Sequence, residues 1–308
     1  MHQDTSVEIS VIAPIFNETE NIDEFISRTE AILKKINKSY EIILIDDFST
    51  DGTRDKILDM SQKNKYLRSI FLSKNFGHQA AIFAGLQNAK GNFTITLDSD
   101  LQDPPELIKE LYTEAKDNNY DIVNTKRITR SGENKLKLLL INFFYLINKI
   151  FFKNIEYNIG DFRIINSKIK KLINTDRKVF FYRSLIQTLG FKQKTLNYHR
   201  EKRYDGDSKA NLKYLFEFAF YGIFNASTIP LNFIFYLALL VTLIFLMTIF
   251  FIIVNILTIS LPILFSFIFF MTFAILISLV IISQYLKYVY EIVTNKPIYI
   301  IDEYINFD

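Results

Sequence analysis

The chain lacks several residues on which common protein chemistries depend. It contains no cysteine and no tryptophan, and its 308 residues include only three histidines, His2, His78 and His199. Without cysteine it forms no disulfide, and histidines so far apart in the sequence have no zinc-type spacing. The sequence also has neither a Walker phosphate loop nor a G-x-G-x-x-G turn. Phosphate binding by these glycine-rich loops is therefore excluded.

Charge is scarce in one long region. The whole chain has a net charge of +3, and its basic residues form no large patch interleaved with aromatic residues, so we expect no nucleic-acid partner. From Phe218 to Leu286 there is no lysine, arginine, aspartate or glutamate. Two apolar segments within this region, about 231–257 and 263–286, each exceed the ~20 residues needed to cross a bilayer. They predict two transmembrane helices within residues 230–288.

The link between the two apolar segments is short and turn-like, so the segments should form a hairpin with both ends on one side. The alternative, a buried helical core, would need a large soluble shell around the uncharged block. Lys209 and Lys213 precede the hairpin, and Lys287 and Lys296 follow it. The positive-inside rule then puts both flanks in the cytoplasm. Because the N-terminus has no apolar signal region, we expect a multi-pass protein of the inner (cytoplasmic) membrane, with its N-terminal domain and its tail, 289–308, in the cytoplasm.

Strands alternate with helices in the N-terminal domain, which we expect to cover residues 1–210. Apolar and periodic runs predict strands at 8–13, 40–45, 67–72, 94–97 and 120–124, and helices at 21–36, from about 54, at 77–89 and at 104–116. This order is typical of βαβ units and of a mostly parallel sheet. Polar loops at 14–18, 46–51 and 98–103 follow three of the strands. A nucleotide fits in the crevice at the carboxyl ends of such strands.

The stretch Thr94 to Glu106, TITLDSDLQDPPE, is the most informative part of this domain. It reads as a strand, an acidic tip and the start of a helix. Asp98 and Asp100, with Gln102 two residues further on, offer hard oxygen ligands of the kind that suits Mg²⁺ or Mn²⁺ when substrate phosphates complete the coordination. An isolated Asp-x-Asp is more often a solvated turn. The surrounding pattern is what favours a metal site here.

Two segments near the hairpin are expected to lie at the membrane surface. Residues 135–153 have a broad apolar face with lysines at both ends, which favours an interfacial helix over the alternative of an ordinary core helix. Residues 211–229 look like a second interfacial helix. The charged run 200–209 between them is either a solvated loop or, beside a membrane, a place where cations hold a lipid phosphate.

With these segments placed, the chain resembles the glycosyltransferase family 2 enzymes, in particular polyprenyl-phosphate hexose transferases such as dolichol-phosphate mannose synthase and the bactoprenol glucosyl transferases. The similarity extends from Val11 to about Lys209. It depends on six motifs in order: APIFNETENI, IDDFSTDGT, LSKNFGHQAAIFAGL, LDSDLQDPPE, GDFRI and R-x₂-GDSK. The resemblance implies an α/β fold of GT-A type with a mostly parallel sheet, followed by interfacial amphipathic helices and the two-helix transmembrane hairpin.

The resemblance also implies roles for individual residues. For the nucleotide sugar these are Pro14, Phe16, Glu18, Asp47, Lys74, Asp98 and Arg127. For the divalent metal, Mg²⁺ or Mn²⁺, they are Asp98, Asp100 and Gln102. Asp100, Asp161 and Arg163 are implied at the reacting centre, and Arg203, Ser208 and Lys209 at the lipid phosphate. Arg127, Arg163, Arg203 and Lys209 are the candidates for phosphate contacts.

The chain departs from the family pattern at one position and lacks one family motif. Phe48 follows the aspartate pair, where the family usually has glycine, and the backbone of a phenylalanine is less free than that of glycine. The Gln-x-x-Arg-Trp motif of many polysaccharide-building members is absent, since the chain has no tryptophan.

The resemblance implies transfer of a hexose, with glucose favoured, from UDP-glucose or another nucleotide diphosphate sugar to a polyprenyl phosphate, in one displacement that inverts the configuration at C1. A metal would neutralise the leaving nucleoside diphosphate. The acceptor phosphate is already an anion and needs little help from a base. Two alternatives stay open: a membrane glycosyltransferase that extends a polysaccharide or a lipid-linked glycan, and a non-catalytic sugar-nucleotide-binding scaffold. Association into a homo-oligomer is also left open.

Overall fold

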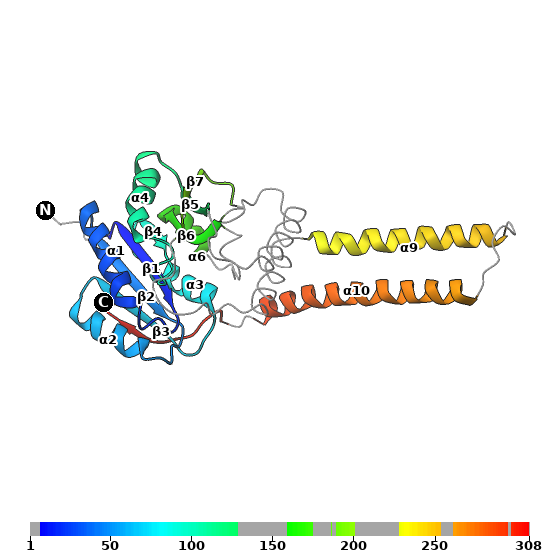
Figure 1. The fold of residues 1–308 in the computed structure, drawn as a ribbon, viewed down its shortest axis with the longest axis horizontal. Helices are drawn as coiled ribbons and strands as arrows, with labels where there is room; N and C mark the ends of the chain where they lie inside the picture. The colour runs from blue at the N-terminus through cyan, green and yellow to red at the C-terminus, as the bar shows by residue number, and fades with distance from the viewer. Residues whose placement is uncertain are drawn as a thin grey trace. The chain divides into compact units, whose positions relative to one another are not determined.

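The computed structural model describes residues 7–128, 159–174, 186, 189–200, 228–253, 261–294 and 297–307. Within these residues the chain divides into two units. An α/β unit combines the described residues up to 200 with residues 297–307, and a helical unit contains the described residues between them (Figure 1). The segment 135–153 and residues 211–227 of the segment 211–229, both predicted as interfacial helices, lie outside the described residues.

The α/β unit is built on an eight-stranded sheet. Its strands are β1 (Ile9–Ile15), β2 (Tyr40–Asp46), β3 (Leu67–Leu72), β4 (Phe93–Thr96), β5 (Ile122–Arg127), β6 (Ile159–Asn166), β7 (Gln193–Tyr198) and β8 (Ile301–Ile305). Their order across the sheet is β7-β5-β6-β4-β1-β2-β3-β8. Strands β4, β1, β2 and β3 pair in parallel, as do β5 and β7, whereas β6 and β8 run antiparallel to their neighbours. The predicted mostly parallel α/β sheet is confirmed.

Helices cover both faces of this sheet. They are α1 (Ile22–Ile36), α2 (Thr53–Lys63), α3 (His78–Asn88), the short 3₁₀ helix η1 (Pro105–Leu107), α4 (Ile108–Asp117) and α6 (Ser167–Asn174). Alternate residues of β1 face opposite layers, because successive side chains of a strand point to opposite faces. Val11 belongs to the core under α1 and α4, and Ile12 to the core under α3 and α6. Burial on both faces explains why these strands read as continuous apolar runs.

Helix α3 lies unusually close to the sheet, as its small residues predict. A Cβ atom at Gly85 would lie 2.8 Å from Cδ1 of Ile45 and 3.0 Å from Cβ of Ile12. Any larger residue would therefore push the helix away from β1 and β2. This close packing matters for the site, because the first turn of α3 lies where the parallel strands end.

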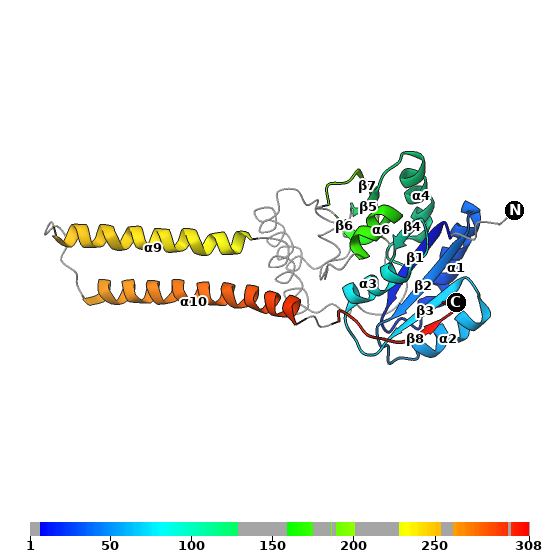
Figure 2. The ribbon, with the colours of Figure 1, turned by 180° about the vertical axis from the view of Figure 1, so that it is seen from behind.

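The last residues of the chain, predicted only as a tail, form strand β8. It lies antiparallel to β3, with Ser69 opposite Ile305 (Figure 2). Arg54 of α2 holds it through ion pairs of 2.8 Å to Asp302 and 3.0 Å to Glu303. The chain therefore leaves the α/β unit, passes through the helical unit and returns to complete the same sheet.

The helical unit consists, within the described residues, of α9 (Ile229–Ile253) and α10 (Leu261–Val293), which lie side by side (Figure 1). Both contain stretches long and apolar enough to cross a membrane, Ile229–Phe250 and Leu264–Lys287. Their most apolar windows are 0% and 6% buried, so these helices do not form the soluble core considered as an alternative. The two predicted spanning segments coincide closely with them.

Candidate active site at the carboxyl end of the sheet

Three loops meet where the neighbouring parallel strands β4, β1 and β2 end, which we call the carboxyl end of the sheet. Asp47 follows β2, Asp98 and Asp100 follow β4, and the loop after β1 carries Phe16 and Glu18. The antiparallel strand β6 begins at this end with Gly160 and Asp161, and β5 finishes here with Arg127. The three polar loops predicted to share one end of the sheet therefore do so.

Hydrogen bonds tie the loops after β1 and β2 to each other. The backbone N–H of Asn17 donates to Oγ of Ser49 at 2.8 Å, and the N–H of Thr50 donates to Oδ1 of Asn17 at 2.7 Å. The N–H of Glu18 donates to Oγ1 of Thr53 at 3.0 Å. The two loops thus form one interlocked surface.

Asp47 connects this surface to the loop after β3. Its carboxylate accepts the backbone N–H of Phe76 at 2.7 Å and of Gly77 at 2.8 Å. Burial raises the pKa of Asp47 to about 6, even though these two hydrogen bonds act in the opposite direction. Asp47 therefore positions the loop that carries the exposed Lys74 and leads into α3.

His78 stands between two carboxylates from neighbouring strands. Its Nε2 atom lies 3.4 Å from Oδ1 of Asp98 and 3.3 Å from Oδ2 of Asp161. Gln79 also donates to Oδ2 of Asp161, at 3.2 Å. Burial raises the pKa of Asp98, and the nearby His78 partly offsets this rise. The first turn of α3 thus holds the two acidic residues that β4 and β6 bring together.

The sequence analysis missed His78 because it considered histidines only as zinc ligands. A signal was available, since His78 follows Gly77 within the motif LSKNFGHQ at the start of a predicted helix.

Asp98 and Asp100 have the chemistry of a divalent cation site. Oδ1 of Asp98 is buried and accepts no hydrogen bond from any described residue. Oδ1 of Asp100 accepts the backbone N–H of Gln102 at 3.1 Å. Burial, followed by the charge of Asp98, raises the pKa of Asp100 to about 6. Two carboxylates that repel each other, one with a buried oxygen that accepts no hydrogen bond, fit a hard cation such as Mg²⁺ or Mn²⁺.

The protein does not supply a complete metal site from acidic and histidine side chains alone. In the part of the chain that the structure describes, no three Asp, Glu or His side chains group so as to hold a metal ion. Mg²⁺ is commonly bound by one or two carboxylates together with substrate phosphates. The residues present fit that arrangement and leave positions for ligand oxygens.

Arg127 is held beside this acidic group by two partners that the sequence analysis did not single out. Its Nη2 lies 3.1 Å from Oδ2 of the buried Asp103, and its Nε donates to the hydroxyl of Tyr198 at 3.0 Å. Burial lowers the pKa of Arg127, but Asp103, Tyr198 and Asp98 together outweigh this effect, so that pKa is raised. A Cβ atom at Gly160 would lie 2.9 Å from Nη2 of Arg127. The glycine of the GDFR motif therefore leaves room for this guanidinium.

Arg163, like Asp161 two residues before it, was implied at the reacting centre and is 0% exposed in the structure. It is fully buried in β6, opposite Thr96 of β4, and its Nη2 donates to the backbone carbonyl of Gly160 at 2.6 Å. In this conformation it has no exposed surface to offer a phosphate. Its contact instead supports the backbone just before Asp161. Arg203, Ser208 and Lys209 lie outside the described residues.

Phe48 has a backbone conformation that glycine adopts more easily than other residues do. Its φ is +66°, in the left-handed region, and 44% of the residue is exposed. The departure noted in the sequence therefore falls on a backbone conformation that a residue with a Cβ rarely adopts.

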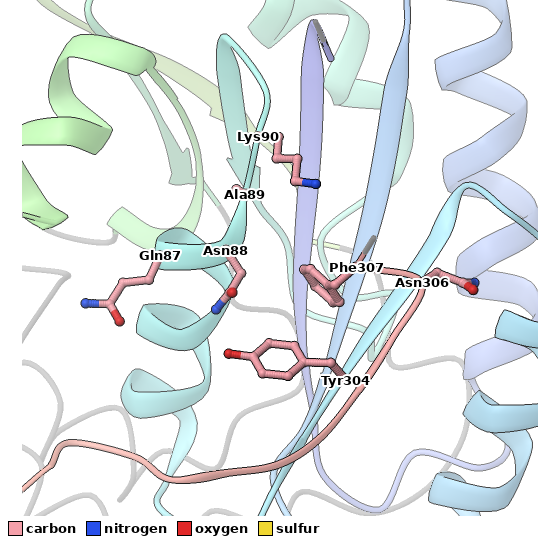
Figure 3. Close-up of a pocket in the computed structure, with 7 residues that line it drawn as sticks. All are labelled: Gln87, Asn88, Ala89, Lys90, Tyr304, Asn306 and Phe307. Carbon is pink, nitrogen blue, oxygen red and sulfur yellow. The ribbon is translucent and has the colours of Figure 1, made fainter. Parts of the chain in front are cut away.

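A pocket of about 630 Å³ lies at the opposite, amino end of the sheet (Figure 3). It opens between the end of α3 and strand β8, and its lining residues are Gln87, Asn88, Ala89, Lys90, Tyr304, Asn306 and Phe307. None of the predicted site residues lines it. The pocket is therefore separate from the candidate active site with Asp98, Asp100 and Asp161 at the carboxyl end of the sheet.

Comparison with known proteins places this geometry in a family. Residues 10–173 match the model of the glycosyl transferase family 2. An uncharacterised glycosyltransferase from Synechocystis is 34% identical over 305 residues, which cover 97% of this chain and 96% of that protein. The prophage-derived bactoprenol glucosyl transferase of Shigella flexneri is 32% identical over 302 residues, covering 96% and 97%.

A bactoprenol glucosyl transferase homologue from an Escherichia coli prophage is 34% identical over 237 residues, which cover 76% of this chain and 77% of that protein. Among solved structures, glucosyl-3-phosphoglycerate synthase from Mycobacterium tuberculosis aligns with a TM-score of 0.49 and 16% identity, covering 69% of this chain and 76% of that one. That structural similarity is too distant to assign roles to residues. The family match and the sequence relatives establish that the chain belongs to glycosyltransferase family 2 and is a glycosyltransferase.

Proposed function

We propose that this glycosyltransferase moves a hexose, glucose as the first choice, from a nucleotide diphosphate sugar to a polyprenyl phosphate. The observation that carries the proposal is the meeting of Asp98, Asp100, Asp161 and Arg127 at one end of the sheet, in a chain 32% identical over 96% of its length to a protein named bactoprenol glucosyl transferase. UDP-glucose is the favoured donor, because that relative is a glucosyl transferase.

The donor nucleotide would lie against the interlocked loops after β1 and β2. Phe16 is 38% exposed there, and the buried Glu18 and Asp47 take part in the hydrogen bonds that hold the loops. Lys74 lies exposed on the loop that Asp47 positions, where a cation can meet the diphosphate. Hydrogen bonds from backbone N–H groups to side-chain oxygens hold these loops, so the surface is organised before the nucleotide binds, which lowers the entropic cost of binding.

Asp98 and Asp100, with Gln102, would hold Mg²⁺ or Mn²⁺ on the diphosphate. The bound ion would act as a Lewis acid and neutralise the charge that develops on the leaving nucleoside diphosphate. The fold holds these two carboxylates in a partly buried position, which raises the pKa of each. Arg127, fixed by Asp103 and Tyr198, adds a guanidinium whose geometry suits phosphate oxygens.

Asp161 would position the sugar or accept a proton beside the reacting carbon. His78 and Gln79 fix its carboxylate from the first turn of α3, so the side chain has little freedom to turn away. The acceptor is a phosphate anion near pH 7 and attacks without a strong base. A single displacement with inversion at C1 follows, and the lipid phosphate would be bound by Arg203, Ser208 and Lys209.

The hairpin of α9 and α10 would keep the enzyme at the depth of the lipid headgroup. Both ends of the helical unit are joined to the α/β unit, because β8 returns to the sheet. This connection supports a hairpin whose two ends lie on one side of the bilayer. The lysines that flank it favour the cytoplasmic side.

The test is transfer of radiolabelled sugar in detergent. Purified full-length protein, undecaprenyl phosphate and Mg²⁺ or Mn²⁺ are offered UDP-glucose, UDP-GlcNAc, UDP-galactose and GDP-mannose in turn. We expect label in the lipid phase with UDP-glucose, loss of that label with EDTA or in Asp100→Ala, and no loss in Asp117→Ala, an exposed carboxylate at the end of α4. Absence of lipid label with every donor, in protein that still binds nucleotide, would overturn the proposed acceptor.

A further inference from the structure

Phe48 has a strained backbone that the packing of the protein does not explain. Among the described residues, six that are not glycine have positive φ, and four of them are asparagine, which tolerates this region. The other two are Leu101 and Phe48, with φ of 59° and 66°. Leu101 is 1% exposed, so burial of its side chain offsets the strain. Phe48 is 44% exposed and has no such compensation.

The residues on both sides of Phe48 hold its backbone in place. The N–H of Asp47 donates to the carbonyl of Ile15 at 2.9 Å, and the Asp47 carboxylate is fixed by the loop after β3. The N–H of Ser49 lies 3.3 Å from both carboxylate oxygens of Asp46, and Oγ of Ser49 accepts the N–H of Asn17. The turn is therefore over-determined, which is the condition under which a strained residue persists.

The ring of Phe48 is partly exposed to solvent. None of the described aromatic rings stacks on it. Phe16, 38% exposed, stands on the neighbouring loop, which is tied to the Phe48 loop by the bonds between Asn17, Ser49 and Thr50. Phe48 is therefore an exposed ring on a loop that hydrogen bonds hold in place. Strained residues of this kind cluster at binding sites.

We propose that the ring of Phe48 is a stacking platform for the base of the nucleotide donor. The inference rests on the proposed function, in which a nucleotide diphosphate sugar occupies this end of the sheet. Every nucleobase has a π-face, so stacking on an aromatic side chain strengthens binding without selecting one base. Phe48 would therefore add affinity for the base and leave recognition of the diphosphate to the cations.

The substitution Phe48→Gly separates strain from binding. Glycine takes φ of +66° without a steric penalty, so the ligand-free melting temperature should stay the same or rise. The same change removes the ring, and we expect the Kd for UDP, or for GDP if that is the tighter ligand, to rise about tenfold. The Kd for inorganic pyrophosphate should change less than about twofold, because pyrophosphate has no base. All Kd values are measured by calorimetry on the full-length protein in detergent with Mn²⁺.

Two further variants complete the experiment. Phe48→Trp keeps an aromatic face and should retain the affinity for UDP. Tyr66→Ala removes an aromatic residue of similar exposure, 42%, before β3 at the amino end of the sheet, and should leave that affinity unchanged. An unchanged UDP affinity in Phe48→Gly, or an equal loss for UDP and pyrophosphate, would overturn the role of Phe48 and leave the proposed function standing. A wild-type protein that binds neither UDP nor GDP would overturn both.

Discussion

Glu41 at the amino end of the sheet and Asp98 at the carboxyl end are both acidic residues of the sheet region, but their surroundings differ. Glu41 is 1% exposed and meets Nε of Arg68 at 3.0 Å, Oγ of Ser10 at 2.5 Å and the backbone N–H of Lys90 at 2.7 Å. Asp98 shares one imidazole with Asp161, and its buried Oδ1 accepts no hydrogen bond from any described residue. Oε2 of Glu41 likewise accepts no hydrogen bond from any described residue, but it lies beside a guanidinium that is always charged, whereas Asp98 lies beside an imidazole that two carboxylates share.

The pKa values of acidic residues also differ between the two ends of the sheet. At the amino end, burial alone would raise the pKa of Glu8, but hydrogen bonds from Lys116, Asn92 and Tyr112 outweigh it and lower that pKa to about 2. At the carboxyl end, burial raises the pKa of Asp47 and of Asp100 to about 6. Folding therefore favours the charged form of Glu8 at the amino end and disfavours the charged forms of Asp47 and Asp100 at the carboxyl end. Carboxylates with raised pKa values are typical of functional sites, and a bound cation would stabilise their charged forms.

Replacing Asp98 should have the largest effect and should separate activity from stability. In Asp98→Asn we expect transfer to fall by about 100-fold or more, since one group that stabilises transition-state charge contributes on that order. The ligand-free melting temperature should stay the same or rise, because the change removes a repelling buried charge. Single-turnover transfer and thermal unfolding, both in detergent, measure the two quantities. If Asp98→Asn lost activity only because it unfolds, Asp98 would be needed for stability, and the predicted difference between the carboxyl end and the amino end of the sheet would be wrong.

Replacing Glu41 should have the opposite pattern. Glu41→Gln leaves Arg68, whose side chain is 16% exposed, without its carboxylate, and removing one partner of a buried ion pair costs about 3 to 5 kcal/mol. We expect the melting temperature to fall by several degrees while the Kd for UDP is unchanged. Calorimetry on the same preparation supplies both values. Weakened UDP binding in folded Glu41→Gln would mean that the two ends are coupled.

The acidic tip after β4 could be predicted from the sequence because its information is local. Asp98 and Asp100 lie in one turn, and the order of strand, loop and helix is enough to assign the end of the sheet at which they lie. His78 and Asp161 are 83 residues apart, and their contact depends on where the antiparallel β6 enters the sheet. No periodicity in the sequence encodes that pairing.

Two other features required the structure for the same reason. Strand β8 has five residues and pairs with β3 more than two hundred residues earlier, so its partner cannot be derived from its own pattern. The family resemblance implied Arg163 as a site residue through the GDFRI motif, and Arg163 does share the face of β6 that carries Asp161. The sequence did not reveal that its guanidinium would be fully buried and bonded to Gly160.

The pH dependence of stability should distinguish the two ends, beginning with Asp47. Its folded pKa is raised to about 6 from an ordinary value of 3.8, so the native state holds the proton more tightly than the unfolded chain. The contribution of Asp47 to stability is therefore present below about pH 4 and is lost as the pH rises to about 6. In Asp47→Asn the melting temperature should fall less over that interval than in the wild type. Identical slopes would show that Asp47 is not destabilised by burial.

Glu8 should give a smaller effect of opposite sign, because it is more open to solvent and screened by it. Its folded pKa of about 2 lies below the ordinary 4.5, so its stabilising contribution is present above pH 4.5 and is lost as the pH falls towards 2. The melting temperature of Glu8→Gln should therefore lie below that of the wild type at pH 6, and the difference should shrink at pH 3. Lys116→Met removes the main cation and should reproduce the loss at pH 6. A difference that persists undiminished at pH 3 would mean that Glu8 stabilises the amino end through packing and not through its charge.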